Sequence, residues 1–434
     1  MSRAEQRVHD LVGIGFGPSN LALAIALREQ AAGSGTPVDA VFLEKQPAFG
    51  WHRGMLIEGT TMQVSFLKDL VTMRNPSSEF GFLNYLQDKG RLVDFINHKT
   101  MFPSRVEFHD YLEWAAAPFA DQVRYGSEVV AVTPVTVDGH VEYLDVVARQ
   151  DGGSGELSTY RTRNLVVAAG LEPVLPEGVP NGDRIWHSED LLRRLPTLED
   201  PRRVLVVGAG QSAAEVVDHL HTTFPAAEVC AVFARYGYTP ADDSPFANRI
   251  FDPGAVDHFY AAGDDVKELL RAYHQSTNYS VVDMDLIEEL YRRHYQERVQ
   301  GVERLRLLNA SRLTDVTAHE GGVKATVRFL PTGEEQVLDA DVLVYATGYR
   351  PTDPLTLLGA TGEHCVRRDD GRVTLGRDYR AVTDATLRCG IYVQGASEHT
   401  HGITSTLLSN TAIRAGEIAA SLTNGRHNAY ALSN

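Results

Sequence analysis

Gly13-Ile14-Gly15-Phe16-Gly17-Pro18 is a glycine-rich turn, and a second one, Gly208-Ala209-Gly210-Gln211-Ser212-Ala213, follows about 195 residues later. The first comes directly after the apolar pair Leu11-Val12, and the second comes directly after the apolar run 204–207. Each turn therefore stands where a strand gives way to a helix, which is how a dinucleotide pyrophosphate is held at a helix N-terminus. Two such turns predict two dinucleotides bound at once. Because hydride transfer is the usual reason to hold both, the pattern indicates a pyridine-nucleotide-dependent flavoenzyme.

The composition bounds the class of protein. At 434 residues the chain is longer than one hydrophobic core usually grows, so two or three domains are expected. The net charge of -16 argues against nucleic acid and anionic membranes as partners. No apolar run approaches the ~20 residues of a membrane span, and the polar N-terminus lacks a signal-peptide core, so a cytoplasmic location is expected. The scattered Cys230, Cys365 and Cys389 fit neither a disulfide framework nor a zinc site, so no metal is expected.

The first glycine turn is followed by a second predicted strand, residues 39–44, which ends in an acid where a ribose-binding carboxylate belongs. Proline stands where the third glycine of the usual motif would be, but the first two glycines still permit the tight turn and the close approach of a pyrophosphate. A simple strand-to-helix connection is the alternative interpretation of such a turn. The residues expected to bind the first dinucleotide are Gly13, Gly15, Gly17, Pro18 and Glu44.

The second unit spans about residues 203–235, with a helix predicted over 212–223 and a strand over 228–234. The strand is followed by Arg235, and NADP favours a cation at this place whereas NAD favours an acid. The sequence therefore favours NADPH, with a solvated surface arginine as the alternative. The residues expected to bind this second dinucleotide are Gly208, Gly210, Gln211, Ser212 and Arg235.

The rest of the chain completes an α/β fold with two Rossmann-like dinucleotide-binding domains. Residues 51–103 are irregular and aromatic, as expected of a segment that lies over a cofactor, and a helix over about 405–422 closes the chain. Further strands are predicted over 141–148, 164–169, 323–329, 341–345 and 390–395, and insertion helices over 266–273 and 283–300. The expected parts are a FAD-binding domain (1–195 and 340–434), an NADPH-binding domain (196–241 and 302–339) and a helical substrate-binding insertion (242–301).

Two classes of flavoenzyme are disfavoured. Dithiol reductases need two neighbouring cysteines, and none of the three cysteines is near another in sequence. Monooxygenases that act on sulfur and amines, and the Baeyer–Villiger group, carry Phe-x-Gly-x-x-x-His before the second glycine turn. Here the corresponding stretch, 183–188, keeps only the histidine, His187.

Several motifs spread over nearly the whole chain carry a more specific signal. They are Trp51-His52, Met62-Gln63-Val64-Ser65-Phe66-Leu67-Lys68-Asp69-Leu70-Val71, Arg74-Asn75-Pro76, Phe102-Pro103-Ser104-Arg105-x-Glu107-Phe108, Ser244-Pro245-Phe246-x-Asn248, Asn278-Tyr279, Ala346-Thr347-Gly348-Tyr349 and His401-Gly402-Ile403-Thr404-Ser405-Thr406-Leu407-Leu408-Ser409. With these motifs the chain resembles the N-hydroxylating flavin monooxygenases of siderophore biosynthesis, above all their L-ornithine branch.

The resemblance implies a role for individual residues. Lys68 and Asn248 are expected to hold the polar backbone end of an amino acid, and Asn278 and Ser409 to lie near substrate and flavin. Gln63 and Tyr279 are expected against the flavin–nicotinamide region; with Asn278 they are the predicted catalytic residues. The remaining cofactor-binding residues implied by the match are Trp51, His52, Thr347 and Leu407.

Each of these residues also has a structural alternative. Lys68 would be a surface cation beside Asp69, and the two asparagines would be helix caps or turn residues. Ser409 would bond back within its own helix. Gln63 would be a loop residue that bonds backbone, and Tyr279 a core aromatic.

Lys68 separates the classes of substrate, because a lysine offers its charge to an α-carboxylate that diamines such as putrescine lack. Ornithine and lysine differ by one methylene, worth about 1–3 kcal/mol in an apolar pocket, so the choice of ornithine follows from the resemblance. An L-lysine N6-hydroxylase, a diamine N-hydroxylase and a FAD- and NADPH-binding redox sensor remain alternatives.

The resemblance implies that NADPH reduces FAD and that O2 then adds to the reduced flavin as a C4a-hydroperoxide. The neutral side-chain amine of L-ornithine is expected to attack the distal oxygen of this hydroperoxide. The product would be N5-hydroxy-L-ornithine for a hydroxamate siderophore or a related natural product. The resemblance also implies a homo-oligomer, namely a tetramer.

Overall fold

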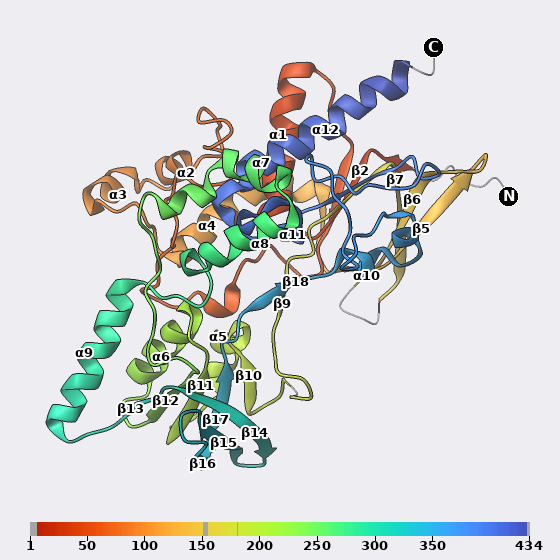
Figure 1. Ribbon diagram of the computed structural model, residues 1–434. Coiled ribbons are helices and arrows are strands. Elements are labelled where there is room, and N and C mark those ends of the chain that lie inside the picture. The colour runs from red at the N-terminus through yellow and green to blue at the C-terminus, as the bar shows by residue number, and fades with distance from the viewer. Residues whose placement is uncertain (1–6, 151–154, 180, 432–434) are drawn as a thin grey trace.

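The computed structural model describes residues 7–150, 155–179 and 181–431, with 425–431 as backbone only. Two parallel five-stranded sheets form the centres of two bodies. In Figure 1 the upper body contains α1 (Pro18–Ser34) and α12 (Thr411–Ala431), and the lower body contains α6 (Gln211–Thr223). The predicted pair of Rossmann-like units is therefore confirmed as an α/β fold.

The first sheet has the strand order β19-β8-β2-β3-β4, with every pair parallel. Its central strands are short and almost entirely buried, as is usual where a parallel sheet is covered on both faces. The middle of α1, residues 20–27, is buried as well, and α1 packs along α12 (Figure 1). The strands are β2 (Leu11–Ile14), β3 (Ala40–Leu43), β4 (Val123–Arg124), β8 (Asn164–Val167) and β19 (Gly390–Val393).

The second sheet has the order β10-β17-β11-β12-β13 and is also parallel throughout. Separate apolar clusters lie on its two faces, one of them under α6. The strands are β10 (Ile185–His187), β11 (Arg203–Val207), β12 (Glu228–Val232), β13 (Leu305–Leu308) and β17 (Val342–Tyr345).

Mostly antiparallel strands, with β1 and β7 as a parallel pair, make up smaller layers on each body and the connection between them. One layer is the sheet β1-β7-β6-β5, and the other is β14-β15-β16. The pair β9 and β18 lies between the two bodies in Figure 1. The bounds are β1 (Val8–His9), β5 (Ser127–Val137), β6 (His140–Gln150), β7 (Leu157–Thr162), β9 (Leu171–Pro173), β14 (Ser311–His319), β15 (Gly322–Phe329), β16 (Glu335–Ala340) and β18 (Tyr349–Pro351).

The other helices cover these sheets and the gap between the bodies. No helix among the described residues is both long enough and apolar enough to cross a membrane. The α-helices are α2 (Phe82–Asp88), α3 (Leu92–His98), α4 (Arg105–Ala116), α5 (Leu191–Arg194), α7 (Pro253–Ala261), α8 (Asp264–Tyr273), α9 (Met284–Gln300), α10 (Pro354–Leu358) and α11 (Glu398–His401). The 3-10 helices are η1 (Arg53–Met55), η2 (Ala117–Gln122), η4 (Ser188–Asp190), η5 (Leu195–Thr197), η6 (Ala247–Phe251), η7 (Gln275–Thr277), η8 (Gly359–His364), η9 (Ile403–Thr406) and η10 (Leu408–Asn410).

The sheet topology moves two of the expected domain boundaries. Strands β10 and β17 belong to the second sheet, although the limits at residues 195 and 340 assign them to the FAD-binding part. The expected insertion is also divided, since α7 contacts α11 in the upper body whereas α9 contacts α6 and β13 in the lower one (Figure 1). The sheet to which a strand belongs is decided by its pairing with strands far away in the sequence. The local sequence pattern does not reveal this pairing.

Two local predictions were wrong. The closing helix begins at Thr411 instead of Ser405, because Leu407 is extended (φ -103°, ψ 157°) and the hydroxyl-rich residues before Thr411 form short 3-10 turns. The segment 51–103, expected to be irregular, contains α2 and α3. The predicted first helix, the helix over 212–223, the insertion helices and the predicted strands are present with shifts of a few residues at their ends.

Candidate active site

Two of the three glycines in the first turn, Gly13 and Gly15, leave no room for a side chain. Gly15 has a φ of +81°, and a Cβ there would collide with the carbonyl oxygen of Ala168. A Cβ on Gly13 would collide with the ring of Phe42, whereas one on Gly17 would meet open space. Helix α1, which begins at Pro18, has neither a capping side chain nor an acid in its first turn. Its N-terminal N–H groups are thus available to a phosphate.

Glu44 is buried beside this turn and holds it. Its Oε2 accepts a hydrogen bond from the Phe16 N–H at 2.7 Å, and its Oε1 accepts one from the Gln46 N–H at 2.8 Å. The sequence predicted a ribose-binding carboxylate here. The ribose contact stays a prediction; in the structure this carboxylate shapes the turn, and its oxygens retain further acceptor sites.

Two buried residues that the sequence analysis did not single out also fix the first turn. The Asn20 Nδ2 donates to the carbonyl oxygens of Ile14 and Gly15 at 3.2 and 2.7 Å. The guanidinium of Arg414, on α12, donates to Ser19 Oγ at 3.2 Å and to Gln394 Oε1 at 3.2 Å. In the sequence, the only signal for the contacts of Asn20 was an asparagine two residues after the glycine motif, directly before an apolar run of the predicted helix.

The second glycine turn repeats the steric pattern of the first. Gly208 has a φ of +147°, and a Cβ there would collide with the carbonyl oxygen of Ala346. Helix α6 also begins without a capping side chain or an acid in its first turn. A cavity of about 570 Å³ lies at the carboxyl ends of β11, β12 and β17, where a dinucleotide binds in open α/β sheets. Gly208 and Thr347 are among the residues that line it.

Arg235 and Gln211, both predicted to bind NADPH, also hold the loop that precedes α9. The exposed Arg235 donates from Nη1 to the Ser280 carbonyl oxygen at 2.8 Å and to Thr239 Oγ1 at 3.2 Å. Gln211 accepts from the Asp283 N–H at 2.8 Å. The loop that carries Asn278 and Tyr279 is therefore attached to the second glycine turn through Gln211 and to the end of β12 through Arg235.

A chain of polar contacts continues from this loop across both bodies. Gln63 donates from Nε2 to Asp283 Oδ1 at 3.2 Å, and Gln211 donates from Nε2 to Asp283 Oδ2 and to Glu215 Oε1, each at 3.0 Å. Glu215 is buried and paired with Arg105 of α4. Asp283, Glu215 and Arg105 were not predicted as site residues.

Lys68 is half-buried and forms no ion pair with the described residues. Its Nζ lies 5.5 Å from the centre of the Phe251 ring. Burial lowers the pKa of Lys68, and the nearby Asp252 partly opposes this shift. The adjacent Asp69 points elsewhere, because its carboxylate accepts hydrogen bonds from the N–H groups of Val71, Thr72 and Phe82. Lys68 is therefore half-buried rather than a fully exposed surface cation, and its charge is not paired with Asp69.

Asn248 and Ser409 lie on segments that meet at Phe251. Asn248 belongs to η6, which ends at Phe251, and its Nδ2 donates to the Asp243 carbonyl oxygen at 2.8 Å. Asn410, the neighbour of Ser409, donates to the Phe251 carbonyl oxygen at 3.1 Å. The hydroxyl of Ser409 is buried (2% exposed) and has no partner among the described residues. The alternative, a bond back within its own helix, is therefore absent from the described residues.

Tyr279 is bound through its hydroxyl to the C-terminal segment. It donates to Glu398 Oε2 at 2.8 Å, and Glu398 in turn lies 3.7 Å from Nε of Arg271. Its 36% exposure is inconsistent with the alternative of a plain core aromatic. Asn278 donates its backbone N–H to the Gln275 carbonyl oxygen at 3.3 Å, and its side chain bonds no described residue.

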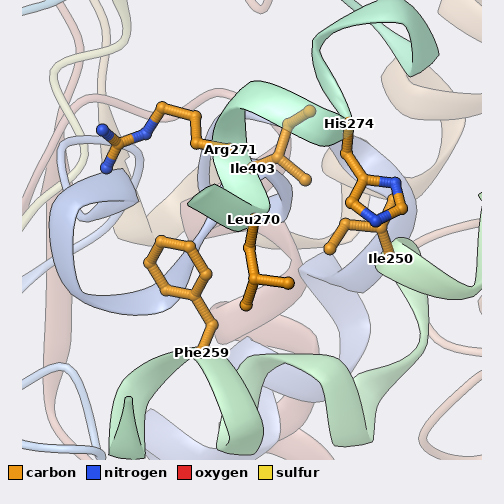
Figure 2. Close-up of a pocket in the computed structure, with 6 residues that line it drawn as sticks. All are labelled: Ile250, Phe259, Leu270, Arg271, His274 and Ile403. Carbon is orange, nitrogen blue, oxygen red and sulfur yellow. The ribbon is translucent and has the colours of Figure 1, made fainter. Parts of the chain in front are cut away.

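Figure 2 shows how the insertion helices are sealed against that C-terminal segment. A cavity of only about 10 Å³ is left between Phe259 of α7, Leu270 of α8 and Ile403 of η9. Ile250, Arg271 and His274 complete its lining. The space is too small for an organic ligand, so these residues form a packed seam beside the candidate substrate residues.

The remaining predicted cofactor residues surround the junction of the bodies. His52 has a φ of +50°, and its ring lies 4.7 Å from that of Trp51 and 6.0 Å from that of Tyr349. The Thr347 hydroxyl donates to the Val174 carbonyl oxygen. Leu407 is half-buried between η9 and η10. Ser212, the second residue of α6, lies at the helix end described above.

Comparisons with known proteins agree with this geometry. The family model for L-lysine 6-monooxygenase/L-ornithine 5-monooxygenase matches residues 7–351. The L-ornithine N(5)-monooxygenase of Pseudomonas aeruginosa is 40% identical over 423 residues, covering 96% of this chain and 94% of that protein. The ornithine N-hydroxylase of Kutzneria sp. 744, in a structure with reduced FAD, NADP+ and L-ornithine, is 45% identical with a TM-score of 0.92, covering 97% and 100% of the two chains. A cadaverine monooxygenase from Erwinia amylovora, bound to FAD, is 26% identical with a TM-score of 0.84 over 96% and 95%. The chain thus belongs to the L-lysine 6-monooxygenase/L-ornithine 5-monooxygenase family of N-hydroxylating flavin monooxygenases.

Proposed function

We propose that this protein hydroxylates the side-chain amine of L-ornithine with O2, using FAD and NADPH, and releases N5-hydroxy-L-ornithine. The observation that carries the choice of an amino acid is Lys68, a half-buried cation with no ion pair among the described residues. Such a charge matches an α-carboxylate, and a diamine has none to offer. The relatives that act on L-ornithine and match almost the full chain support the same substrate.

The residues around the first glycine turn fit FAD. The uncapped N-terminus of α1 and the open space beside Gly17 suit a pyrophosphate, and Glu44 lies at the place of a ribose partner. Trp51, His52 and Leu407 are proposed to lie along the flavin. When bound, NADPH would supply a hydride to FAD, and the reduced FAD would supply the activation of O2.

The residues around the second glycine turn fit NADPH. The uncapped N-terminus of α6, with Gly210, Gln211 and Ser212, suits a second pyrophosphate. Arg235 keeps guanidinium N–H groups that bond no described residue, as a 2′-phosphate partner needs. The cavity at the ends of β11, β12 and β17 lies next to this turn, with Gly208, Ala209 and Thr347 in its lining.

The protein groups proposed to act on the substrate position it rather than react with it. Lys68 and Asn248 would hold the carboxylate and amino group of the amino acid, and the free hydroxyl of Ser409 would orient it. The side-chain amine has to be neutral to attack an electrophilic oxygen, so activity is expected to rise with pH. Gln63, Asn278 and Tyr279 are proposed to line the reacting region and to exclude water from it.

The deciding experiment is the yield of hydroxylated amine per NADPH consumed by the FAD-loaded enzyme in air. L-Ornithine, L-lysine and putrescine are compared in parallel. A near-stoichiometric product with L-ornithine alone is expected. Equal product with L-lysine or putrescine would overturn the substrate assignment, and hydrogen peroxide alone with all three would favour the redox-sensor alternative.

We further propose that the enzyme is a cytoplasmic homo-oligomer, a tetramer by family resemblance, whose product enters a hydroxamate siderophore or a related natural product. Helix α9 supports association, because Met284, Tyr291, Tyr295 and Val299 are large apolar side chains on it with exposures from 51% to 70%. Sedimentation of the wild type and of a Tyr295→Glu variant would test this, with a smaller species expected for the variant.

A further inference from the structure

Asp283 occupies the N-cap position of α9 without capping that helix. An aspartate in this position ordinarily accepts a hydrogen bond from an N–H group of the first turn. Here Oδ1 accepts from Gln63 Nε2 at 3.2 Å and Oδ2 accepts from Gln211 Nε2 at 3.0 Å. The carboxylate is therefore directed at two glutamines from different parts of the chain, at the expense of its own helix.

The contact with Asp283 decides which way the Gln63 amide is turned. A carboxylate only accepts hydrogen bonds, so it selects the NH2 end of the amide and leaves the carbonyl oxygen on the opposite side. Gln63 is exposed, and the side that its oxygen faces is available to a ligand. Without Asp283, the amide would be free to present either end.

The same carboxylate is fastened to the second glycine turn. The Asp283 N–H donates to Gln211 Oε1 at 2.8 Å, which closes a reciprocal pair between the two residues. Gln211 is the first residue of α6, and Glu215, one turn later, accepts a further hydrogen bond from it at 3.0 Å. Burial raises the pKa of Asp283, and the bond from Gln63 opposes that shift, as expected for a carboxylate held by donors.

We propose that Asp283 is a positioning residue, which turns the carbonyl oxygen of Gln63 toward the flavin–nicotinamide region and couples it to the N-terminus of the NADPH-binding helix. The inference rests on the proposed function, which puts Gln63 beside that region. An acceptor oxygen fixed there would bind an amide or ring N–H group, such as the carboxamide of the nicotinamide. Asp283 then acts through Gln63 and does not touch the reacting atoms.

The test uses the full-length, FAD-loaded enzyme and the substitution Asp283→Asn. Asparagine offers one oxygen and one NH2 in place of two oxygens, so one of the two glutamines meets a donor instead of an acceptor. We expect about tenfold weaker binding of NADP+, measured from the change in flavin absorbance, or about tenfold slower flavin reduction by NADPH. The thermal midpoint is expected to change little, because the residue is only half-buried. The matched control is Asp285→Asn, an exposed acid in the first turn of the same helix, with wild-type values expected.

A double-mutant cycle separates positioning from a merely structural role. In a Gln63→Ala background, Asp283→Asn is expected to cause a smaller loss of NADP+ binding or reduction rate than in the wild type, and the part that remains is carried by the Gln211 contact. The proposal would be overturned if the fold-losses of Gln63→Ala and Asp283→Asn simply multiplied in the double variant. It would also be overturned if Asp283→Asn alone gave the wild-type values expected of Asp285→Asn. These readouts need no amine substrate, so an enzyme that bound NADP+ as expected but did not hydroxylate L-ornithine would refute the proposed function alone.

Discussion

Arg105 and Glu215, 110 residues apart in the chain, form a two-point ion pair, with Nη2 2.7 Å from Oε1 and Nη1 2.9 Å from Oε2. Their side chains are only 13% and 3% exposed. The pair joins α4 of the upper body to α6 of the lower one, and Arg105 also donates to the Met55 carbonyl oxygen at 3.1 Å. The relation between the two dinucleotide-binding units is thus held by a buried, directional contact as well as by apolar packing.

Glu215→Gln is expected to lower the free energy of unfolding by about 3 kcal/mol, because it leaves the buried charge of Arg105 without its partner. Urea denaturation measures the loss. Glu172→Gln serves as control, since Glu172 pairs with Arg350 at the surface, where loss of the pair costs about 0.5 kcal/mol or less. Equal losses in both variants would contradict the role given to the buried pair.

Lys68→Ala is expected to lower kcat/KM for L-ornithine by about 10- to 100-fold, because a charge-assisted hydrogen bond to the α-carboxylate is lost. Flavin reduction by NADPH should change little. Lys324→Ala, which removes an exposed lysine from β15, should leave both rates at wild-type values. An unchanged kcat/KM for L-ornithine in the Lys68 variant would rule out the carboxylate contact.

Ser409→Ala is expected to leave the unfolding free energy within about 0.5 kcal/mol of wild type, because the buried hydroxyl has no partner among the described residues. The KM for L-ornithine should nevertheless rise by about 5- to 10-fold if this hydroxyl binds the substrate. Ser405→Ala is the matched comparison, since that buried hydroxyl donates to the Gly402 carbonyl oxygen and its loss should cost about 1 kcal/mol. A Ser409 variant that loses stability without a change in KM would contradict the assignment.

Gly15→Ala is expected to destabilise the protein by about 2 kcal/mol or more, even without FAD, because it combines a φ of +81° with a collision against Ala168. Gly17→Ala is the control, because a Cβ there meets open space. The cofactor-free Gly17 variant should therefore unfold like the wild type, and any effect should appear in the affinity for FAD. Thermal unfolding with and without FAD distinguishes these cases, and equal destabilisation of both cofactor-free variants would contradict the argument.

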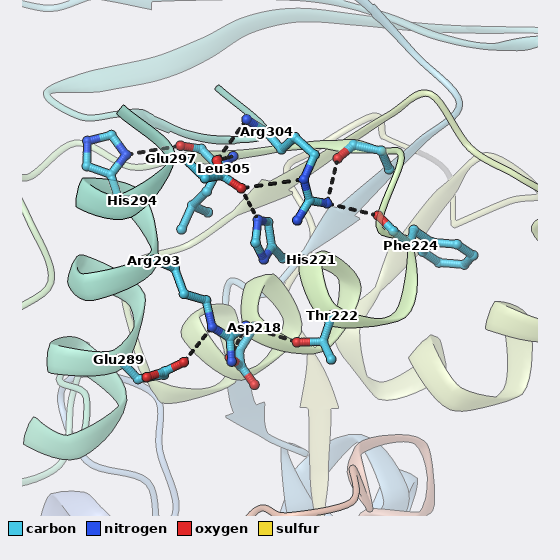
Figure 3. Close-up of polar contacts among 11 residues, drawn as sticks. Asp218, His221, Thr222, Phe224, Glu289, Arg293, His294, Glu297, Arg304 and Leu305 are labelled. Atoms are coloured by element: carbon cyan, nitrogen blue, oxygen red, sulfur yellow. Dashed lines mark hydrogen bonds and ion pairs between the residues drawn. The ribbon is translucent and has the colours of Figure 1, made fainter. Parts of the chain in front are cut away.

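Glu297 is predicted to make stability depend on pH. Figure 3 shows this residue of α9 facing α6 and the start of β13. Its carboxylate accepts hydrogen bonds from His221 Nε2 at 2.7 Å and from the N–H groups of Arg304 and Leu305 at 2.8 and 2.7 Å. Burial by itself would raise the pKa of Glu297, but these hydrogen bonds lower it below its ordinary value of 4.5. The stabilisation is therefore complete above that ordinary pKa and is lost as the pH falls through the lower pKa of the folded state.

Glu297→Gln is accordingly expected to cost about 3 kcal/mol near neutral pH, and the difference from wild type should shrink as the pH falls below the ordinary pKa of 4.5. Urea denaturation at several pH values measures it. Glu288→Gln, an exposed glutamate on the same helix, should show no such difference at any pH. A gap for Glu297→Gln that stays constant with pH would contradict the prediction.

Local features of the sequence determined much of this fold. The glycine turns, the short apolar strands before them and the helices after them each depend on neighbouring residues, so the parallel units around Gly13 and Gly208 were predictable from the pattern. The start of the last helix was not, because the extended Leu407 is set by how η9 and η10 pack and not by helix propensity. The same applies to β10 and β17, whose sheet is decided by pairing partners far away in the chain.

The candidate site shows the same division. The residue types and motifs indicated Lys68, Gln63, Asn248 and Ser409, and the glycine spacing indicated two dinucleotides. Only the tertiary structure brings Gln63 to Asp283 across 220 residues and Arg105 to Glu215 across 110. A sequence pattern records which groups are available, whereas hydrogen bonds and ion pairs need atoms within about 3 Å, and the docking of the two bodies alone creates those distances.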